Sequence, residues 1–175
     1  MNNLARWKGK RRRWDVLASI VKENGFTFYA EIGINQGANL RQLLSKCPDL
    51  RAVAVDDWRL GYLGWDRRKR DFSRRKFAGV NKKFKDRIYL YEMSSEAAAG
   101  LIPDNALDMV FIDADHSYDG VLADIALWGP KVRQGGVVSG HDYRHPDFPD
   151  VSRAVDHAFP GGVQTGEDWV WWTRS

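Results

Sequence analysis

The sequence predicts an α/β fold in which one doubly wound, largely parallel sheet is covered by helices on both faces. Three observations predict it: short apolar runs alternate with helix-like segments, acidic residues directly follow these runs, and the chain closes with a tryptophan-rich hairpin. The two strands of a strand–helix–strand unit run in parallel, so the residues that follow them emerge at one edge of the sheet. Ligands of open α/β sheets bind at that edge.

The first 25 residues are expected to form a basic arm and a helix ahead of the main domain, residues 26–175. Apolar residues at helical spacing indicate the helix, and Asn24-Gly25 ends it. These apolar positions are Val16, Leu17, Ile20 and Val21.

The main domain contains five runs with the length of strands rather than helices. They lie at residues 26–33, 52–55, 88–91, 109–112 and 137–138. Helical segments alternate with them, and an edge hairpin follows the last helix. The expected helices begin after Gly37, run through the basic segment and span 97–101, 118–128 and 151–159, with the hairpin at 161–172. In the basic segment, Phe77, Val80 and Phe84 form an apolar face that Phe72 can share.

Length and composition indicate one domain with a full core. The chain has 175 residues, 43% of them hydrophobic. Its single cysteine, Cys47, excludes an internal disulfide framework and favours a cytoplasmic location. No apolar run is long enough for a signal peptide or a membrane span, so we expect no membrane association.

Basic charge is concentrated in two segments of an otherwise acidic chain. Residues 6–13 hold six Lys or Arg and no acid, and residues 59–87 hold twelve against three aspartates. Such segments suit an acidic glycan, a nucleotide-sugar or RNA as partner, or they form a solvated helix face. The interleaved Trp7, Trp14 and Trp65 are compatible with base stacking.

A glycine-containing loop follows the first strand of the main domain, with the pattern Glu31-x-Gly33-x-x-x-Gly37. Gly33 permits a sharp turn, and Gly37 permits close approach of a ligand at a helix start. The spacing differs from the GxGxxG of dinucleotide-binding loops. Asp56 ends the next strand about 20 residues later, where a carboxylate can hold a ribose diol. A purely structural turn and a solvated acid are the alternatives.

These motifs, with Ser94-Ser95 and Asp113 after the next two strands, resemble those of class I S-adenosylmethionine-dependent methyltransferases. The resemblance extends from about Phe26 to the C-terminus. Its most specific part resembles a small subgroup related to the metal-dependent O-methyltransferases. This part comprises Phe-Ile-Asp113-x-Asp115-His116-Ser117-Tyr118 and Gly140-His141-Asp142-Tyr143. The resemblance implies a Rossmann-like three-layer sandwich with a seven-stranded, mostly parallel sheet and an antiparallel final strand.

The resemblance also implies S-adenosylmethionine as the cofactor. Glu31 and Gly33 would lie by its methionine part, Asp56 would bind the ribose hydroxyls, and Ser94 and Ser95 would lie by the adenine. The other candidate contacts are Asn35, Gly37, Asp57, Trp58 and Asp113. A core aromatic is the alternative role for Trp58.

Methyl transfer to an oxygen requires removal of the acceptor's proton, and the residues offer two devices. Asp113 and Asp142 match the strand-end carboxylates that hold a divalent cation such as Mg²⁺ in metal-dependent relatives, with His116 matching the histidine base of the macrolide-sugar enzymes. In place of a further oxygen ligand, this chain has His141 or Tyr143. Without a metal, His116 or His141 is the base, and Asp113 or Asp142 orients it.

Two acids near this cluster are expected to have other roles. Asp115 caps the helix that begins near Tyr118, and Asp124 is solvated because it faces away from the apolar stripe of that helix.

The expected activity is O-methylation of a small-molecule or glycan acceptor. An RNA methyltransferase that uses the basic segments and a nucleoside-binding module without catalysis are the alternatives.

Overall fold

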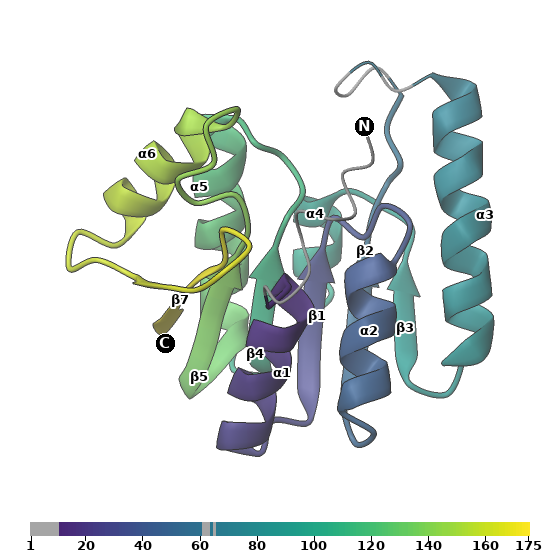
Figure 1. Ribbon diagram of the computed structural model, residues 1–175, viewed down its shortest axis with the longest axis horizontal. Coiled ribbons are helices and arrows are strands. Elements are labelled where there is room, and N and C mark those ends of the chain that lie inside the picture. Colours follow the sequence, from purple (N-terminus) through teal and green to yellow (C-terminus); the bar gives the residue numbers. More distant parts are fainter. Residues whose placement is uncertain (1–10, 61–63, 65) are drawn as a thin grey trace.

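The computed structural model, which describes residues 11–60, 64 and 66–175, contains a seven-stranded sheet in the order β3-β2-β1-β4-β5-β7-β6 (Figure 1). The strands are β1 (Phe28–Ile32), β2 (Arg51–Val55), β3 (Ile88–Tyr91), β4 (Leu107–Ile112), β5 (Val132–Gly140), β6 (Gln164–Thr165) and β7 (Trp171–Arg174). The first five strands pair in parallel, whereas β7 is antiparallel to β5 and to β6. The predicted fold class is therefore confirmed, including the reversed final strand.

Helices cover both faces of this sheet and make two separate apolar layers. The helices are α1 (Arg13–Asn24), α2 (Ala38–Lys46), α3 (Arg67–Lys83), α4 (Ser95–Ala99), α5 (Tyr118–Trp128) and α6 (Pro149–Ala158), with a 3-10 turn, η3 (Gly129–Lys131). One core cluster joins α1, α2 and α3 to the sheet, and the other joins α4, α5 and α6 to its opposite face. Figure 1 shows α1, α2 and α3 on the near side of the strands. Residues 1–10 of the expected basic arm lie outside the described residues.

Short polar side chains begin several helices. Asp66 accepts a hydrogen bond from the Lys69 backbone N–H, and Ser117 accepts one from that of Gly120. The expectation that Asp115 caps α5 is wrong in detail, because Ser117 is the cap and Asp115 instead accepts a bond from the Ser117 N–H at 2.8 Å.

The apolar pattern of the basic segment was misleading at one position. Phe77, Val80 and Phe84 are buried in the core, but Phe72 is 45% exposed. Phe72 lies about 140° around the helix from Phe77, so the face that buries one ring directs the other to solvent.

Among the helices in the described part of the chain, none combines the length and apolar character needed to cross a membrane.

The central parallel strands end level with one another. Ile32 at the end of β1 pairs with Val55 at the end of β2 and with Ile112 at the end of β4, and Ile112 in turn pairs with Gly140 at the end of β5. The segments that follow these strands therefore leave the sheet at a common edge. This edge carries almost every residue that the sequence nominated for chemistry.

Gly33 has a backbone φ of +86°, and a Cβ at this position would lie 2.2 Å from the Asp113 carbonyl oxygen. We therefore expect Gly33→Ala to destabilise the protein by about 3–5 kcal/mol through backbone strain and overlap. Urea unfolding monitored by circular dichroism measures the effect.

Gly79→Ala is the matched control. This glycine lies inside α3 with open space around its Cα, so alanine should stabilise the helix by about 0.5–1 kcal/mol. Equal, small effects of the two substitutions would contradict the close approach of Gly33 to Asp113.

Candidate active site

A cavity of about 750 Å³ opens at the carboxyl edge of the sheet. Its walls come from the segments that follow β1, β2, β3 and β4, together with one face of α5. The volume lies within the range of small-molecule and cofactor pockets. Nine of the predicted site residues line it: Gly33, Asn35, Asp56, Asp57, Trp58, Ser94, Ser95, Asp113 and His116.

Glu31 and Gly37 lie behind this wall. Glu31 is only 2% exposed, and its Oε2 accepts hydrogen bonds from the Tyr29 hydroxyl at 3.0 Å and from Asn39 Nδ2 at 2.9 Å. Burial raises the pKa of Glu31 to about 7, against the opposing effect of these two bonds. Gly37 is the N-cap of α2, and a Cβ there would lie 2.7 Å from the Phe77 ring. Its missing side chain therefore makes room for a core aromatic.

Asp56 joins the two loops that form one side of the cavity. Its Oδ2 accepts a bond from the Asn35 N–H and its Oδ1 one from the Trp58 N–H, both at 2.7 Å. The Trp58 indole donates in turn to the Asn35 carbonyl oxygen at 3.0 Å. Burial raises the pKa of Asp56 despite these bonds. The neighbouring Asp57 is exposed, and its Oδ1 accepts a bond from the Arg59 N–H at 3.0 Å.

Asp124 is buried on the α5 side of the cavity, so the expectation that it is solvated is wrong. It is 5% exposed and accepts a hydrogen bond from the Ser95 hydroxyl, which itself accepts one from Trp128 Nε1 at 2.8 Å. Burial raises the pKa of Asp124 to about 6. The sequence contained the signal, because Asp124 lies three residues after Val121 and four before Trp128, on the face that the helix buries.

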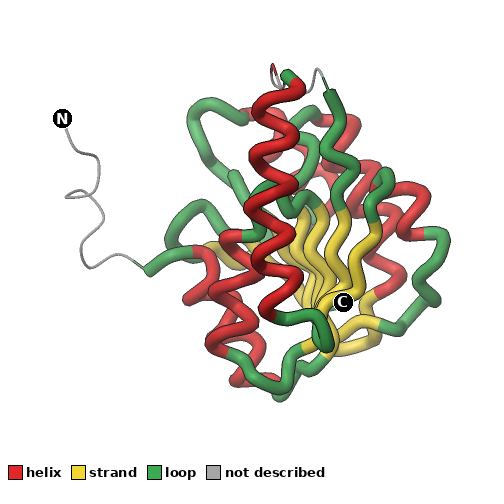
Figure 2. The backbone as a smooth tube through the Cα atoms, turned by 90° about the vertical axis from the view of Figure 1, so that its right-hand side faces the viewer, coloured by secondary structure: helices red, strands yellow, loops and turns green. Residues whose placement is uncertain are grey.

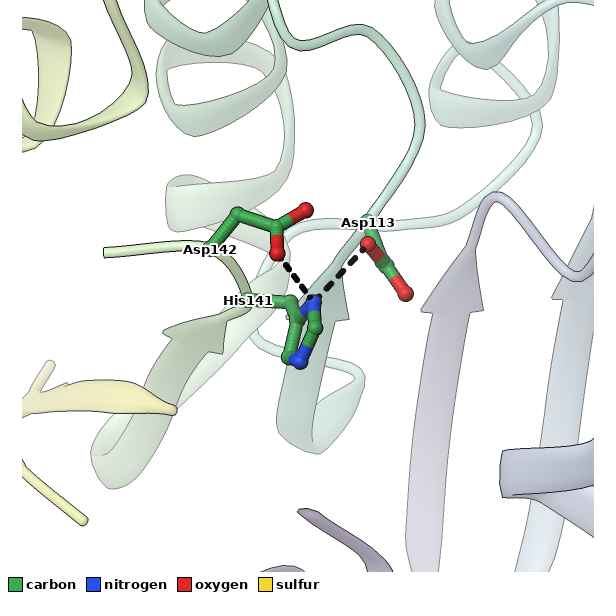
Figure 3. A group of neighbouring side chains, drawn as sticks. All are labelled: Asp113, His141 and Asp142. Carbon is green, nitrogen blue, oxygen red and sulfur yellow. Dashed lines mark ion pairs between the residues drawn. The ribbon is translucent and has the colours of Figure 1, made fainter. Parts of the chain in front are cut away.

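Carboxylates and imidazoles converge at the other end of the site. His141 Nδ1 lies 2.9 Å from Asp142 Oδ1 and 3.6 Å from Asp113 Oδ1, as Figure 3 shows. His116 Nε2 lies 2.8 Å from Asp142 Oδ2 and 3.7 Å from Asp113 Oδ1. The ring of His116 also stacks on Phe148, with 4.3 Å between the ring centroids. The structure thus brings together all four residues that the sequence nominated for proton or metal chemistry.

These neighbours strongly favour the ionised carboxylates. Burial opposes ionisation, but the adjacent His116 and His141 rings hold the pKa of Asp113 at about 2 and that of Asp142 well below its ordinary value. The same two carboxylates raise the pKa of His141, again against the effect of burial. The cluster is therefore held together by opposite charges in a partly dry site.

Arg13 was not among the predicted site residues, because the sequence placed it in the basic segment of residues 6–13. Arg13 is the first residue of α1, and its Nη1 lies 2.7 Å from Asp113 Oδ2. Its backbone N–H donates to Asp168 Oδ2 at 3.0 Å. A separation of 100 residues between Arg13 and Asp113 leaves no local signal for this pair.

His141 and Asp142 lie beside the cavity rather than in its lining.

The sheet order, the reversed final strand and the cavity at the carboxyl edge define a protein of the class I methyltransferase type. Residues 30–143 match the model of the family described as a methyltransferase domain, and the chain belongs to this family. The match covers the central loops and ends at Tyr143.

Similar proteins include uncharacterized protein R132 of Acanthamoeba polyphaga mimivirus, which is 28% identical over 142 residues. That match covers 80% of this chain, and the chain spans only 62% of the relative's length. An O-methyltransferase of Bacillus cereus, solved in complex with SAH, superposes with a TM-score of 0.66 at 15% identity, covering 98% of this chain and 86% of that one. The O-methyltransferase TomG of Streptomyces achromogenes, in complex with SAM, gives 0.65 at 16% identity, covering 93% and 79%. These two structures share the fold.

Burial of Glu31 predicts a pH-dependent stability. Its folded pKa of about 7 lies above the ordinary 4.5, so its contribution is complete below about pH 4.5 and is lost as the pH rises through 7. Glu31→Gln should remove this loss, which amounts to roughly 3 kcal/mol at pH 8. Urea unfolding of both proteins between about pH 4.5 and 8 measures the difference.

Glu96→Gln, an exposed change in the first turn of α4, is the control. Its stability curve should run parallel to that of the unmodified protein. If the Glu31→Gln curve does the same, Glu31 is not a proton-binding group of the folded state.

Proposed function

We propose that this protein is an S-adenosylmethionine-dependent O-methyltransferase that acts on a small molecule or a sugar. The observation that carries the proposal is the continuity of the cavity, which extends from Ser94 and Ser95 to Asp113 and His116. A nucleoside with an amino-acid tail suits a cavity with this lining, with its reactive end beside the carboxylate–imidazole cluster. The SAM and SAH found in the solved structures of similar fold agree with this assignment.

The cofactor contacts follow from the lining. Asp56 and Asp57 would accept hydrogen bonds from the ribose hydroxyls. The carboxylate oxygens of Asp56 accept the Asn35 and Trp58 N–H groups and that of Asp57 accepts the Arg59 N–H, and each carboxylate retains further lone pairs. Ser94 and Ser95 would lie by the adenine, and Gly33, Asn35 and Asp113 by the methionine part, with Trp58 as a wall of the pocket. Glu31 and Gly37 would act indirectly, by shaping the loop that bears Gly33 and Asn35.

Asp124 belongs to the same end of the site. Its carboxylate fixes the Ser95 hydroxyl, and both residues line the cavity. We therefore assign Asp124 the positioning of Ser95 against the adenine, a role that the sequence alone did not suggest.

Calorimetric titration with S-adenosylhomocysteine tests the cofactor assignment. The intact protein should bind it, and Asp56→Asn should weaken binding about tenfold to thirtyfold through loss of a charge-assisted hydrogen bond. Asp86→Asn, an exposed change between α3 and β3, should leave affinity unchanged. Thermal unfolding establishes that each variant is folded. If the intact protein fails to bind, the proposal is wrong.

His116 is the best candidate for the general base. It lines the cavity, and Asp142 Oδ2, at 2.8 Å from Nε2, orients its ring and stabilises the imidazolium that forms on proton uptake. Bound S-adenosylmethionine supplies a methyl group on a positively charged sulfur. The acceptor oxygen would bond to the methyl carbon as the carbon–sulfur bond breaks, which leaves neutral S-adenosylhomocysteine. His116 would take the proton of the acceptor, while Arg13 and Asp113 balance charge beside it.

The donor atoms of Asp113, His141 and Asp142 also suit a divalent cation, since they lie within 4.8 Å of one another. One nitrogen and two oxygens favour Mn²⁺ or a similar transition metal over Mg²⁺, which prefers oxygen ligands only. A cation there would lower the pKa of an acceptor hydroxyl. We propose that these three residues form its site, with Asp113 retaining its contact with Arg13 through the other oxygen.

A matched pair of histidine variants separates the two roles. His116→Gln should reduce turnover about 100-fold. The glutamine amide can still donate to Asp142, so Mn²⁺ binding should change by less than tenfold, whereas His141→Gln removes a ligand and should weaken Mn²⁺ binding by more than tenfold. Turnover is followed as release of S-adenosylhomocysteine with a panel of catechols and sugars, and Mn²⁺ binding by calorimetry after treatment with EDTA.

Two results would contradict these roles. Full turnover by His116→Gln would exclude it as the base, and preferential binding of Mg²⁺ would contradict the role of the His141 nitrogen. A protein that binds the cofactor but methylates none of the panel would favour the nucleoside-binding module.

A further inference from the structure

α3 carries a repeat of paired cations, of which Lys69 alone lines the cavity of the candidate active site. Residues 67–83 contain nine Lys or Arg and a single acid, Asp71. Six of the nine form three adjacent pairs, seven residues apart. They are Arg68-Lys69, Arg75-Lys76 and Lys82-Lys83, and we call them the α3 cation ladder. Seven residues make nearly two helical turns, so the pairs recur on one side of the helix about 10.5 Å apart.

The ladder faces solvent along the whole helix. All six of its side chains are exposed, whereas Ser73, Phe77 and Val80 on the other side of α3 are buried. The helix stands at the β3 edge of the sheet in Figure 1 and comes to the front in Figure 2. The first and last pairs are about 21 Å apart, so the ladder forms an extended basic strip rather than a point charge.

The uniform sign of the ladder is unfavourable for the helix itself. The ion pairs that α3 forms with Asp71 and Glu92 involve Arg70 and Arg74, outside the ladder. Arg68, Arg75 and Lys82 make no salt bridge with any residue that the structure describes.

Cations also occupy the first turn of α3, where they oppose the helix dipole, and only the last pair, Lys82-Lys83, lies in the last turn, where the dipole favours them. A helix face that contacts only solvent is more stable with charges of both signs, because opposite charges at i and i+4 form favourable pairs. The pattern therefore indicates a polyanionic partner.

An exposed aromatic ring lies within the ladder. Phe72 falls between the first two cation pairs on the same side of the helix, and Lys76 Nζ lies 5.4 Å from its ring centroid. A solvent-facing ring bordered by cations is the arrangement on which bases of single strands stack. Every nucleic-acid base presents a π-face to such a ring, whereas sugar rings contact it only through C–H groups and lipid headgroups have no flat surface, so the aromatic favours nucleic acid among the polyanions.

We propose that the α3 cation ladder binds the phosphates of a single-stranded nucleic acid, with Phe72 stacking on one of its bases. Lys69 of the first pair also lines the 750 Å³ cavity, so a strand that follows the ladder reaches the cavity mouth. The ladder's binding does not depend on methyl transfer and can be measured in the absence of cofactor.

Fluorescence anisotropy with a labelled oligouridylate of about 20 nucleotides tests this surface. Six phosphate contacts give a slope of log affinity against log salt of about −4 between about 50 and 200 mM KCl. The triple variant Arg68→Gln, Arg75→Gln, Lys82→Gln should weaken binding at least tenfold and reduce the magnitude of the slope by about 2. Glutamine keeps helix propensity, so the fold is retained.

A charge-matched control removes three exposed cations elsewhere, Lys22, Arg41 and Arg51, by the same change to glutamine. It should retain most of the affinity. Equal losses in the two triple variants would overturn the proposal, because net charge alone would then explain binding. Absence of salt-dependent binding by the intact protein would overturn it as well.

Phe72→Ala distinguishes nucleic acid from other polyanions. It should weaken oligouridylate binding about tenfold without changing the salt slope, and should not affect an abasic strand of the same length. Phe72→Leu retains apolar area but lacks the stacking ring, and should behave like alanine. Equal affinity of the intact protein for the abasic strand, for a duplex or for anionic lipid vesicles would overturn the single-strand assignment.

Discussion

The common ending of four parallel strands is the constraint on which the rest of this structure depends. Hydrogen-bonded register aligns the last residues of β2, β1, β4 and β5, so loops that are distant in the sequence must leave the sheet together. Gly33 is what lets them pack at that edge, since the β1 loop passes against the Asp113 backbone with no room for a side chain. Cavity, carboxylates and imidazoles are all consequences of this alignment.

Much of this architecture could be predicted because its signals are local. Short apolar runs identified the strands, and a strand end followed by acids indicated the functional edge. Two of the wrong predictions, those for Asp124 and Phe72, share one physical cause, since they depend on which side of a helix meets the sheet. Asp124 was predicted to face solvent and is buried, and Phe72 was placed on the apolar face of its helix and is exposed. Arg13 could not be found at all, because its contact with Asp113 exists only after α1 has packed.

The electrostatics of the cluster follow from partial burial. Two carboxylates set close together in a poorly solvated site are tolerable only with compensating cations. Here Arg13 and His141 supply that compensation. Either an imidazolium or a metal ion can therefore balance the negative charge of these carboxylates. Which of the two is present determines how an acceptor oxygen loses its proton.

Two hydrogen bonds join the first helix, α1, to the C-terminal segment of the chain. Arg13 at the start of α1 bonds to Asp168, just ahead of β7, and Arg174 within β7 reaches back to Asn24 at the end of α1 with a 2.8 Å hydrogen bond. All four residues of these two hydrogen bonds lie outside residues 30–143, which match the family model. A fragment trimmed to those limits would lack both Arg13 and the strand β7 that pairs with β5, so the region of sequence similarity is shorter than the set of elements that contact one another in the fold.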